Sequence, residues 1–584
     1  MRRSGHRRPS AAAARDPTGV SLQPPLPSRF VVAGLVAVSI LGALLLYSPA
    51  LRGGFVFDDV QITRSPLYHA TSLSDVGRVL VSSVPRRLGR ASFALNHYLG
   101  GLDPEGYHLV NVLVHAANGV LLALLAFSLL RRLPSDHPWA RRAGPIALAG
   151  TALWFVHPVQ TQAVAYVWQR YTCLSAAFSL ACLLSYVHAR GGTRPRLLFA
   201  ASALFGVLAL LTKESAGALP LVIVLVEWAF LAPRPGSPAR RWPALLAATA
   251  AFAMIAAVLL GPRFVGMMSA DFARRGFTAT ERLLTQSRVL VHYLSLLALP
   301  HPSRLNLDYD FPLSRSLVDP PTTLLSVLAL AAALAVAVAR WRGDRLLSFA
   351  ILWFFVNHLV ESTVVPLDLA YEHRLYTPSM FPLVFLVGHL WTRVSSGAVR
   401  GIALGTVLVA FSVWTVERNR YWADPVALLE DNAAKSPRKA RVQANLAWAY
   451  VARGRMEEAG QALERALAAD PELIVAYQNL AAMHLQGGRL DRARELLEEA
   501  VRRAPVYMQA RVDLAAVCMQ LGDPACAAKH LRRTVEILND KPPTKDQATT
   551  YESLAAALVL AGDPEGAKTA AARAEEMRSA STGR

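Results

Sequence analysis

Long apolar runs separated by short arginine clusters limit the fold of this sequence more than any other feature. A helix that crosses a membrane needs about 20 mostly apolar residues. The stretches that come close to this length are 30–48, 107–130, 144–157, 171–189, 196–212, 215–233, 243–261, 320–340, 345–361, 375–392 and 400–416. The sequence therefore predicts an all-α, polytopic membrane bundle of about 11 spans.

The composition agrees with a membrane protein. Apolar residues make up 53% of the 584 residues and charged residues only 17%, whereas a soluble chain carries roughly 25% charged residues. These values exclude an ordinary soluble enzyme and an intrinsically disordered chain, and four cysteines are too few for a disulfide scaffold. The net charge of +20 lies largely in arginine clusters between apolar runs. Because this distribution follows membrane topology, we expect no nucleic-acid partner.

The arginine clusters predict the orientation of the spans, because basic residues collect in short cytoplasmic loops. If every cluster is cytoplasmic, the N-terminus is cytoplasmic too, and everything after about residue 417 lies on the non-cytoplasmic side. The sequence thus predicts a multi-pass protein of the cell inner (plasma) membrane. Counting Leu283–Pro300 as a span would invert the later clusters, so we expect an interfacial or re-entrant helix there. The clusters are Arg131, Arg132, Arg141 and Arg142; Arg190, Arg194 and Arg196; Arg234, Arg240 and Arg241; Arg340, Arg342 and Arg345; and Arg393 with Arg400.

The C-terminal part repeats itself with a period of 34 residues. Leucines recur at 446, 480 and 514 and alanines at 447, 481 and 515, and Pro471 and Pro505 end the first two units. This spacing is typical of tetratricopeptide repeats, which stack helix pairs into a solenoid with a concave groove for a peptide ligand. The predicted divisions are a basic cytoplasmic N-terminus (1–29), a membrane domain (30–420), a linker (421–439) and the repeats (440–580).

The four cysteines are predicted to be thiols. Cys518 and Cys526 fall on the two helices of the third repeat, in a compartment that oxidises thiols, but packed thiols are favoured over a bridge. Cys173 and Cys182 are nine residues apart on one helix, so they point in nearly opposite directions and cannot bridge.

An acidic pair follows the first span. Asp58 and Asp59 repel each other, so their titration is coupled and one is expected to be raised towards neutrality. Such a carboxylate suits removal of a proton from a hydroxyl that accepts a sugar. The alternative is a solvated loop start or a helix N-cap.

Further polar residues stand at the outer ends of spans. Lys213–Glu214 and the run Glu372, His373, Arg374 and Tyr376 offer cations that fit a lipid phosphate leaving group. Alternatively, their side chains reach the membrane interface for topological reasons. His157 fits a ligand, a base or a helix cap.

No spacing typical of a protein-only metal site or of a nucleotide-binding loop occurs in the sequence. An outward-facing enzyme without a nucleotide needs an activated donor that is carried in the membrane. A divalent metal ion held jointly by the acidic pair and the donor phosphate stays open.

At these residues the chain resembles the transmembrane and tetratricopeptide-repeat O-mannosyltransferase (TMTC) family of the GT-C superfamily, whose enzymes use polyprenyl-phosphate sugar donors. The resemblance implies a GT-C-like membrane domain and catalytic roles for Asp58 and Asp59. The sequence departs from the family at Gln160 and Gln162, where members often carry His and Glu. The segments that carry the resemblance are Phe57-Asp58-Asp59, Gly101–Pro104, Gly106–Asn111 with His115, His157-Pro158-Val159, Leu211–Glu214, Leu307–Asp310, Glu372–Tyr376 and the repeats.

Three functions fit these observations. The first is an inverting glycosyltransferase that moves a sugar such as mannose from a polyprenyl-phosphate donor to a protein Ser or Thr hydroxyl on the non-cytoplasmic side. The second is the same enzyme acting on a lipid or surface polysaccharide, so that the acceptor is a glycan. The third is a non-enzymatic membrane scaffold that binds partners through its repeats. The arginine-rich, lysine-poor composition fits a bacterial donor lipid.

Overall fold

The computed structural model describes residues 28–191, 194–231, 272, 275–539 and 545–582. Throughout these residues the chain forms helices, turns and loops, and no strand occurs among them. The predicted all-α class is therefore confirmed. The chain divides into two compact units, Met1–Leu428 and Leu429–Arg584.

Seven helical segments among the described residues are long and apolar enough to cross a membrane. They match seven of the predicted spans. The segments are Arg29–Arg52, which contains α1 (Arg29–Tyr47); Pro104–Leu130 (α5); Val167–Ala189, which contains α9 (Arg170–Ala189); Pro195–Thr212 (α10); Glu214–Leu231, which contains α11 (Leu219–Val226); Thr322–Ala339 (α14); and Gly397–Trp422 (α17).

The other predicted spans are shorter or lie outside the described residues. The stretches 144–157, 345–361 and 375–392 form α7 (Ala143–Phe155), α15 (Arg345–His358) and α16 (Met380–Arg393), each shorter than a typical crossing helix. The stretch 243–261 lies outside the described residues. The segment set aside as interfacial forms α13 (Ala279–Ala298) and is not among the seven long apolar helices.

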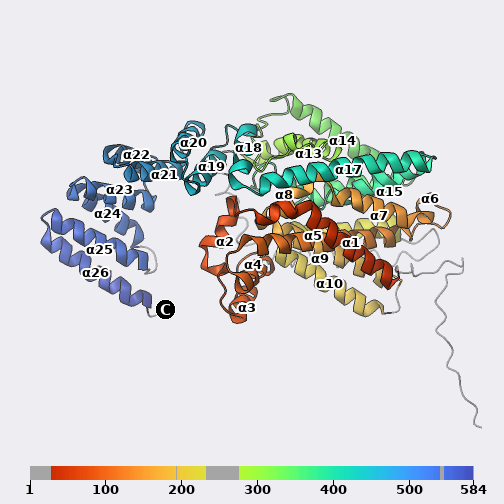
Figure 1. The fold of residues 1–584 in the computed structure, drawn as a ribbon, viewed down its shortest axis with the longest axis horizontal. Coiled ribbons are helices and arrows are strands. Elements are labelled where there is room, and N and C mark those ends of the chain that lie inside the picture. The colour runs from red at the N-terminus through yellow and green to blue at the C-terminus, as the bar shows by residue number, and fades with distance from the viewer. Residues whose placement is uncertain (1–27, 192–193, 232–271, 273–274, 540–544, 583–584) are drawn as a thin grey trace, which may run out of the picture. The chain divides into compact units, whose positions relative to one another are not determined.

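The loop between the first two predicted spans is itself helical. It folds into α2 (Val60–Arg64), α3 (Leu73–Val81) and α4 (Arg87–Gly100), which lie at one end of the bundle in Figure 1. Within the bundle α5 packs against α1, α7 and α9, and α10 packs against α9. Two short helices, α6 (Pro138–Arg141) and α8 (Thr161–Ala165), complete this part.

Local sequence signals fix where several of these helices begin. The Ser72 hydroxyl accepts the N–H of Asp75, and the Asp75 carboxylate accepts the N–H of Ser72, which starts α3. Thr278 and Glu281 form the same reciprocal pair at the start of α13. Such pairs satisfy two backbone donors that a helix start would otherwise leave unpaired.

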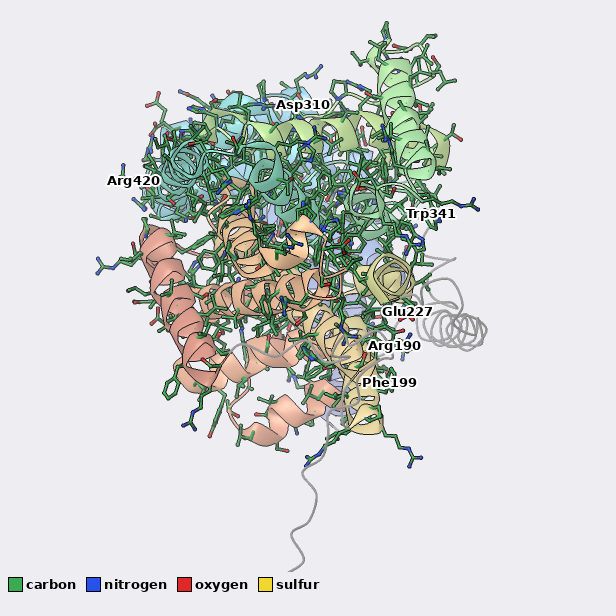
Figure 2. All side chains as sticks on the ribbon, turned by 90° about the vertical axis from the view of Figure 1, so that its right-hand side faces the viewer. Arg190, Phe199, Glu227, Asp310, Trp341 and Arg420 are labelled. Atoms are coloured by element: carbon green, nitrogen blue, oxygen red, sulfur yellow. A yellow bond between two sulfur atoms is a disulfide. The ribbon has the colours of Figure 1, made fainter. Side chains whose placement is uncertain are left out.

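Four of the five arginine clusters gather at the same end of the bundle. Arg190 at the end of α9 donates to Glu227 with Nε at 2.9 Å from Oε2, and Figure 2 shows the two residues side by side. Trp228, which follows Glu227 in the chain, stacks on Trp341, with ring centroids 3.7 Å apart. Arg132 donates to the Val187 carbonyl. The remaining links are Arg142 to the carbonyl of Trp391 and Trp139 against Phe385.

These contacts bring together the clusters that the sequence assigns to one side of the membrane. The cluster at 234–241 lies outside the described residues. The starts of α9 and of the turn after α10 lie at the opposite end, because an α-helix of 20 residues is about 30 Å long.

The described residues of the second unit form four helix pairs, of which the first three follow the predicted 34-residue period. The small residues that recur every 34 positions pack between the helices, since Ala459, Ala493 and Ala527 are fully buried. The helices are α19 (Ala440–Ala452) and α20 (Met456–Ala469), α21 (Ile474–Gln486) and α22 (Leu490–Arg503), α23 (Met508–Gln520) and α24 (Pro524–Leu538), and α25 (Lys545–Leu560) and α26 (Pro564–Thr582); α18 (Pro425–Lys435) contains the boundary between the units.

A glycine in the left-handed region turns the chain within each pair. Gly454, Gly488 and Gly522 have φ values of 71°, 70° and 72°, and Gly562 follows with 80°. Residues with a Cβ rarely adopt this conformation. The same 34-residue period therefore also sets the turns of the first three pairs.

One expectation about the cysteines is wrong. Cys518 on α23 and Cys526 on α24 are joined by a disulfide, because the turn between the two helices brings their Cα atoms to 5.9 Å, within the range a bridge requires. Cys173 and Cys182 are buried free thiols, as predicted.

Candidate active site

The two acidic residues of the loop between the first two predicted spans lie in different environments. Asp58 and Asp59 belong to a 3-10 turn, Phe57–Asp59. Asp59 is fully buried, and its Oδ2 and Oδ1 accept the backbone N–H groups of Val56 at 3.1 Å and Trp168 at 2.6 Å. Asp58 is exposed. Asp59 therefore holds the loop in place, and Asp58 is the carboxyl of the pair that a ligand can reach.

Electrostatics separate the pair further. Burial holds the pKa of Asp59 well above its usual value. The N–H groups of Val56 and Trp168 lower the pKa, and the charge of Asp58 raises it by a smaller amount. The raised carboxyl expected for this pair is therefore Asp59.

The loop that follows α7 binds the acidic turn, Phe57–Asp59, through hydrogen bonds. The Asp58 backbone N–H donates to the Tyr166 hydroxyl at 2.9 Å. Phe57 has a φ of 49°, an unusual value for a residue with a side chain. The sequence alone did not point to Tyr166 or Trp168. Both follow His157 in the same predicted loop, and this position is the signal that could have identified them.

The predicted cations meet in a cavity at the same end of the bundle. Lys213, His373 and Arg374 all line it. Its other polar lining residues are Thr172, Ser175, Ser179, Ser215, Asn357, Glu361 and Thr377. Segments far apart in sequence thus form one pocket, among them the start of α9, the turn η6 (Glu214–Ala218) and the turn before α16.

Lys213 and Arg374 are both held by protein groups. The Lys213 ammonium pairs with Glu361, with Nζ at 2.6 Å from Oε1, and it donates to the Thr172 hydroxyl at 2.9 Å. The Arg374 guanidinium donates to the Leu369 carbonyl at 3.0 Å and lies over the ring of Tyr371. Both cations are buried, so an anion in the cavity would meet charges that water screens weakly.

Glu214 takes a different place from the one predicted. It does not line the cavity but pairs with Arg86, whose Nε lies 2.8 Å from Oε2 and 3.0 Å from Oε1. Arg86 adopts a left-handed φ of 57° before α4, and its guanidinium lies 5.4 Å from the ring centre of Tyr171. Arg86 is a cation near the cavity that the sequence analysis did not single out.

A short stretch of chain connects the acidic pair to the cavity. The backbone N–H of Trp168 binds Asp59, and the hydroxyl of Thr172 binds Lys213. Four residues span at most about 14 Å. The acidic turn and the cation-lined cavity are therefore neighbours within one unit.

The chain has relatives among named proteins. Profiles described as tetratricopeptide repeat match residues 440–473 and 480–542. Protein O-mannosyl-transferase TMTC4 of Mus musculus is 32% identical over 217 residues, which are 33% of this chain and 28% of the relative. Protein O-mannosyl-transferase F38B6.6 of Caenorhabditis elegans is 24% identical over 469 residues, 75% of this chain and 62% of the relative.

The chain is similar to proteins of the TMTC family. A third relative, protein O-mannosyl-transferase Tmtc1 of Drosophila melanogaster, is 38% identical over 167 residues, which are 26% of this chain and 18% of the relative. The matched part is thus less than two thirds of the length of each of these three relatives. With seven long apolar helices among its described residues, the chain is a multi-pass membrane protein.

Three other predicted residues, Glu372, Tyr376 and His157, are not among the residues that line the cavity. Glu372 is buried and accepts the Tyr309 hydroxyl at 2.7 Å. The Tyr376 hydroxyl is 2.8 Å from His115 Nδ1. Of the roles left open for His157, the structure shows the cap, since its Nδ1 accepts the N–H of Val159.

The two positions that depart from the TMTC pattern are buried. Gln160 donates to the Ser379 hydroxyl at 3.2 Å. Gln162 donates to the Leu307 carbonyl at 2.9 Å and accepts the backbone N–H of His373 at 2.8 Å. Gln162 therefore connects a loop to the cavity wall, a role that only the fold reveals.

The acidic pair does not fit a metal ion held by both carboxylates. Asp59 is fully buried and both of its oxygens accept backbone N–H groups, so Asp58 is the carboxylate of the pair that is exposed to an ion. Across the part of the chain that the structure describes, no group of three or more His, Cys, Asp or Glu side chains is arranged to hold a metal ion.

Proposed function

We propose that this chain is a membrane glycosyltransferase that moves mannose from a polyprenyl-phosphate donor to a Ser or Thr hydroxyl of a protein on the non-cytoplasmic side. The observation that carries the proposal is the cavity with Lys213 and Arg374, which lies next to an exposed carboxylate in an acidic turn. The relatives' shared name, protein O-mannosyl-transferase, supports the sugar and the acceptor class.

The donor phosphate would bind between the buried cations. Lys213 and Arg374 come from different elements and face one cavity. Negative charge grows on the phosphate oxygen as its bond to the sugar breaks, and fixed cations stabilise that charge most effectively where water is excluded. The cations therefore lower the barrier to departure of the polyprenyl phosphate.

Asp58 would act as the general base. Its carboxylate takes the proton of the acceptor hydroxyl while the hydroxyl oxygen attacks the anomeric carbon. The bond between that carbon and the phosphate oxygen breaks, and polyprenyl phosphate leaves on the opposite face, so the configuration inverts. Asp59 would position the turn, since both of its oxygens are bound to backbone N–H groups.

The repeats would present the acceptor peptide on the same side of the membrane. Their stacked helix pairs are an architecture that exposes a concave binding surface. The disulfide between Cys518 and Cys526 supports the side assignment, because disulfides persist outside the cytoplasm and are rare within it.

The disulfide gives a test of the side on which the repeats lie. In protein isolated from cells with thiols blocked at once, we expect two of the four cysteines to react after denaturation and all four after reduction. Mass spectrometry after alkylation counts the labelled thiols. A Cys518→Ser/Cys526→Ser variant is the control and should show two thiols under both conditions. Four reactive thiols without reductant in the unsubstituted protein would contradict the side assignment.

The activity itself is tested with donors of defined structure. Purified full-length protein is incubated with polyprenyl-phosphate esters of mannose, glucose and galactose, with and without a Ser/Thr-rich peptide. We expect the mannose ester to be consumed fastest, and its mannose to appear on the peptide. If none of the donors is hydrolysed or transferred, the proposed function is wrong.

A further inference from the structure

The wall of the cation-lined cavity contains a histidine whose orientation is fixed by Gln162. The Gln162 amide is fully buried, and its Nε2 lies 2.9 Å from the Leu307 carbonyl and 3.4 Å from that of Asn306. Its Oε1 accepts the backbone N–H of His373 at 2.8 Å. Two carbonyls need a donor and an N–H needs an acceptor, so the amide has one orientation that satisfies all three groups.

This orientation determines which ring nitrogen of His373 carries the proton. Nδ1 lies 3.0 Å from the same Gln162 Oε1. A carbonyl oxygen only accepts hydrogen bonds, so Nδ1 must be the donor. The ring is also stacked on Tyr371, with centroids 5.0 Å apart, which fixes its plane.

The surroundings keep the ring neutral. Burial holds the pKa of His373 well below its usual value, and the charges of Lys213, Arg374 and Arg86 lower it further. The nearby carboxylates are already paired, Glu361 with Lys213 and Glu214 with Arg86. A neutral ring with its proton on Nδ1 has a lone pair on Nε2.

Nε2 is the edge of His373 that remains for a ligand. His373 lines the cavity, and its Nδ1 edge is occupied by Gln162. Among the residues that the structure describes, no hydrogen bond to Nε2 is formed. The cavity thus combines cations for an anion with one neutral acceptor for a hydrogen-bond donor.

We propose that His373, positioned by Gln162, accepts a hydrogen bond from a sugar hydroxyl of a ligand whose phosphate binds Lys213 and Arg374. This inference rests on the proposed function and names the part of the donor that the cavity recognises. A phosphate that is bound at neutral pH has mainly acceptor oxygens, whereas a sugar offers hydroxyl donors. The pair His373–Gln162 therefore distinguishes the glycosylated lipid from the bare lipid phosphate that remains after transfer.

The amide at position 162 is important for this role. A carboxylate there, which TMTC members often carry, would stabilise a second proton on the ring and turn Nε2 into a donor. A neutral amide holds Nδ1–H without that effect. The departure from the family pattern at Gln162 thus preserves the acceptor.

Two variants of His373 separate the acceptor from the rest of the side chain. In His373→Asn the side-chain amide still reaches Gln162 but nothing replaces Nε2. In His373→Gln the longer side chain brings an acceptor oxygen to the place of Nε2. Full-length protein in detergent is titrated with a polyprenyl phosphate and with its mannose ester, and the ratio of the two affinities is compared among the proteins.

We expect the preference for the mannose ester to fall about five- to tenfold in His373→Asn, the effect of one neutral hydrogen bond. His373→Gln should keep most of the preference. An unchanged affinity ratio in His373→Asn, or an equal fall in both variants, overturns the inference about His373. The proposed function is judged separately, and mannose transfer by the unsubstituted protein upholds it. If the unsubstituted protein binds neither lipid, both proposals are wrong.

Discussion

Replacing Asp58 by Asn is expected to lower the rate of mannose transfer at least about 100-fold, because a general base typically contributes 10²- to 10⁴-fold. Asn has the same shape but cannot take the proton of the acceptor hydroxyl. Since the Asp58 side chain is exposed, the free energy of unfolding should change by less than about 0.5 kcal/mol. Transfer assays and thermal unfolding in the same detergent measure both quantities.

Asp59→Asn is the matched control and should behave differently. Both oxygens of Asp59 accept backbone N–H groups in a buried place. An amide NH₂ would face one of these donors and leave it unpaired, at a cost of about 1–3 kcal/mol. We therefore expect Asp59→Asn to lower the unfolding temperature as well as the rate. Full transfer activity in Asp58→Asn would show that Asp58 is not the base.

Replacing Lys213 by Met is expected to destabilise the membrane unit by about 3–5 kcal/mol, because it leaves the buried Glu361 carboxylate without its partner. The double variant Lys213→Met/Glu361→Gln removes both charges, so most of this stability should return. Thermal unfolding of the three purified proteins measures the difference.

The same double variant separates folding from donor binding. If Lys213 holds the donor phosphate, loss of one charged hydrogen bond should weaken binding of the polyprenyl-phosphate donor about 10- to 100-fold in a protein that is folded. Glu361→Gln alone is the matched control, since it keeps the cation and should bind the donor at least as well. Donor affinity that is equal in the double variant and the unsubstituted protein would exclude Lys213 from the phosphate site.

The sequence predicted the elements of this protein well because their signals are local. The apolar runs, the 34-residue repeat and the acidic pair are all visible within short windows. The arginine clusters also predicted which helix ends lie together, and the contacts of Arg190 and Trp341 agree with this arrangement. Helix lengths were less predictable at 345–361 and 375–392, where the helices are shorter than the apolar runs.

The sequence did not separate the residues of the site from their neighbours. It grouped Glu214, Glu372 and Tyr376 with Lys213 and Arg374, and all five are polar residues at the outer ends of apolar runs. In the fold the first three bind protein groups, among them Arg86, Tyr309 and His115. Lys213 and Arg374 bind protein groups too, but they also line the cavity, and which polar side chains do so depends on how distant segments pack together.

The sequence by itself determined the all-α class, the apolar helices, the repeat unit and the acidic turn, because each depends on residues close together in the chain. Only the tertiary structure decided which carboxyl of the pair is enclosed and which histidine nitrogen faces the cavity. Asp59 is bound by a backbone N–H 109 residues away, and His373 by a glutamine 211 residues away. Burial and hydrogen bonding set the protonation and orientation of these groups, and both arise from contacts that a local pattern does not contain.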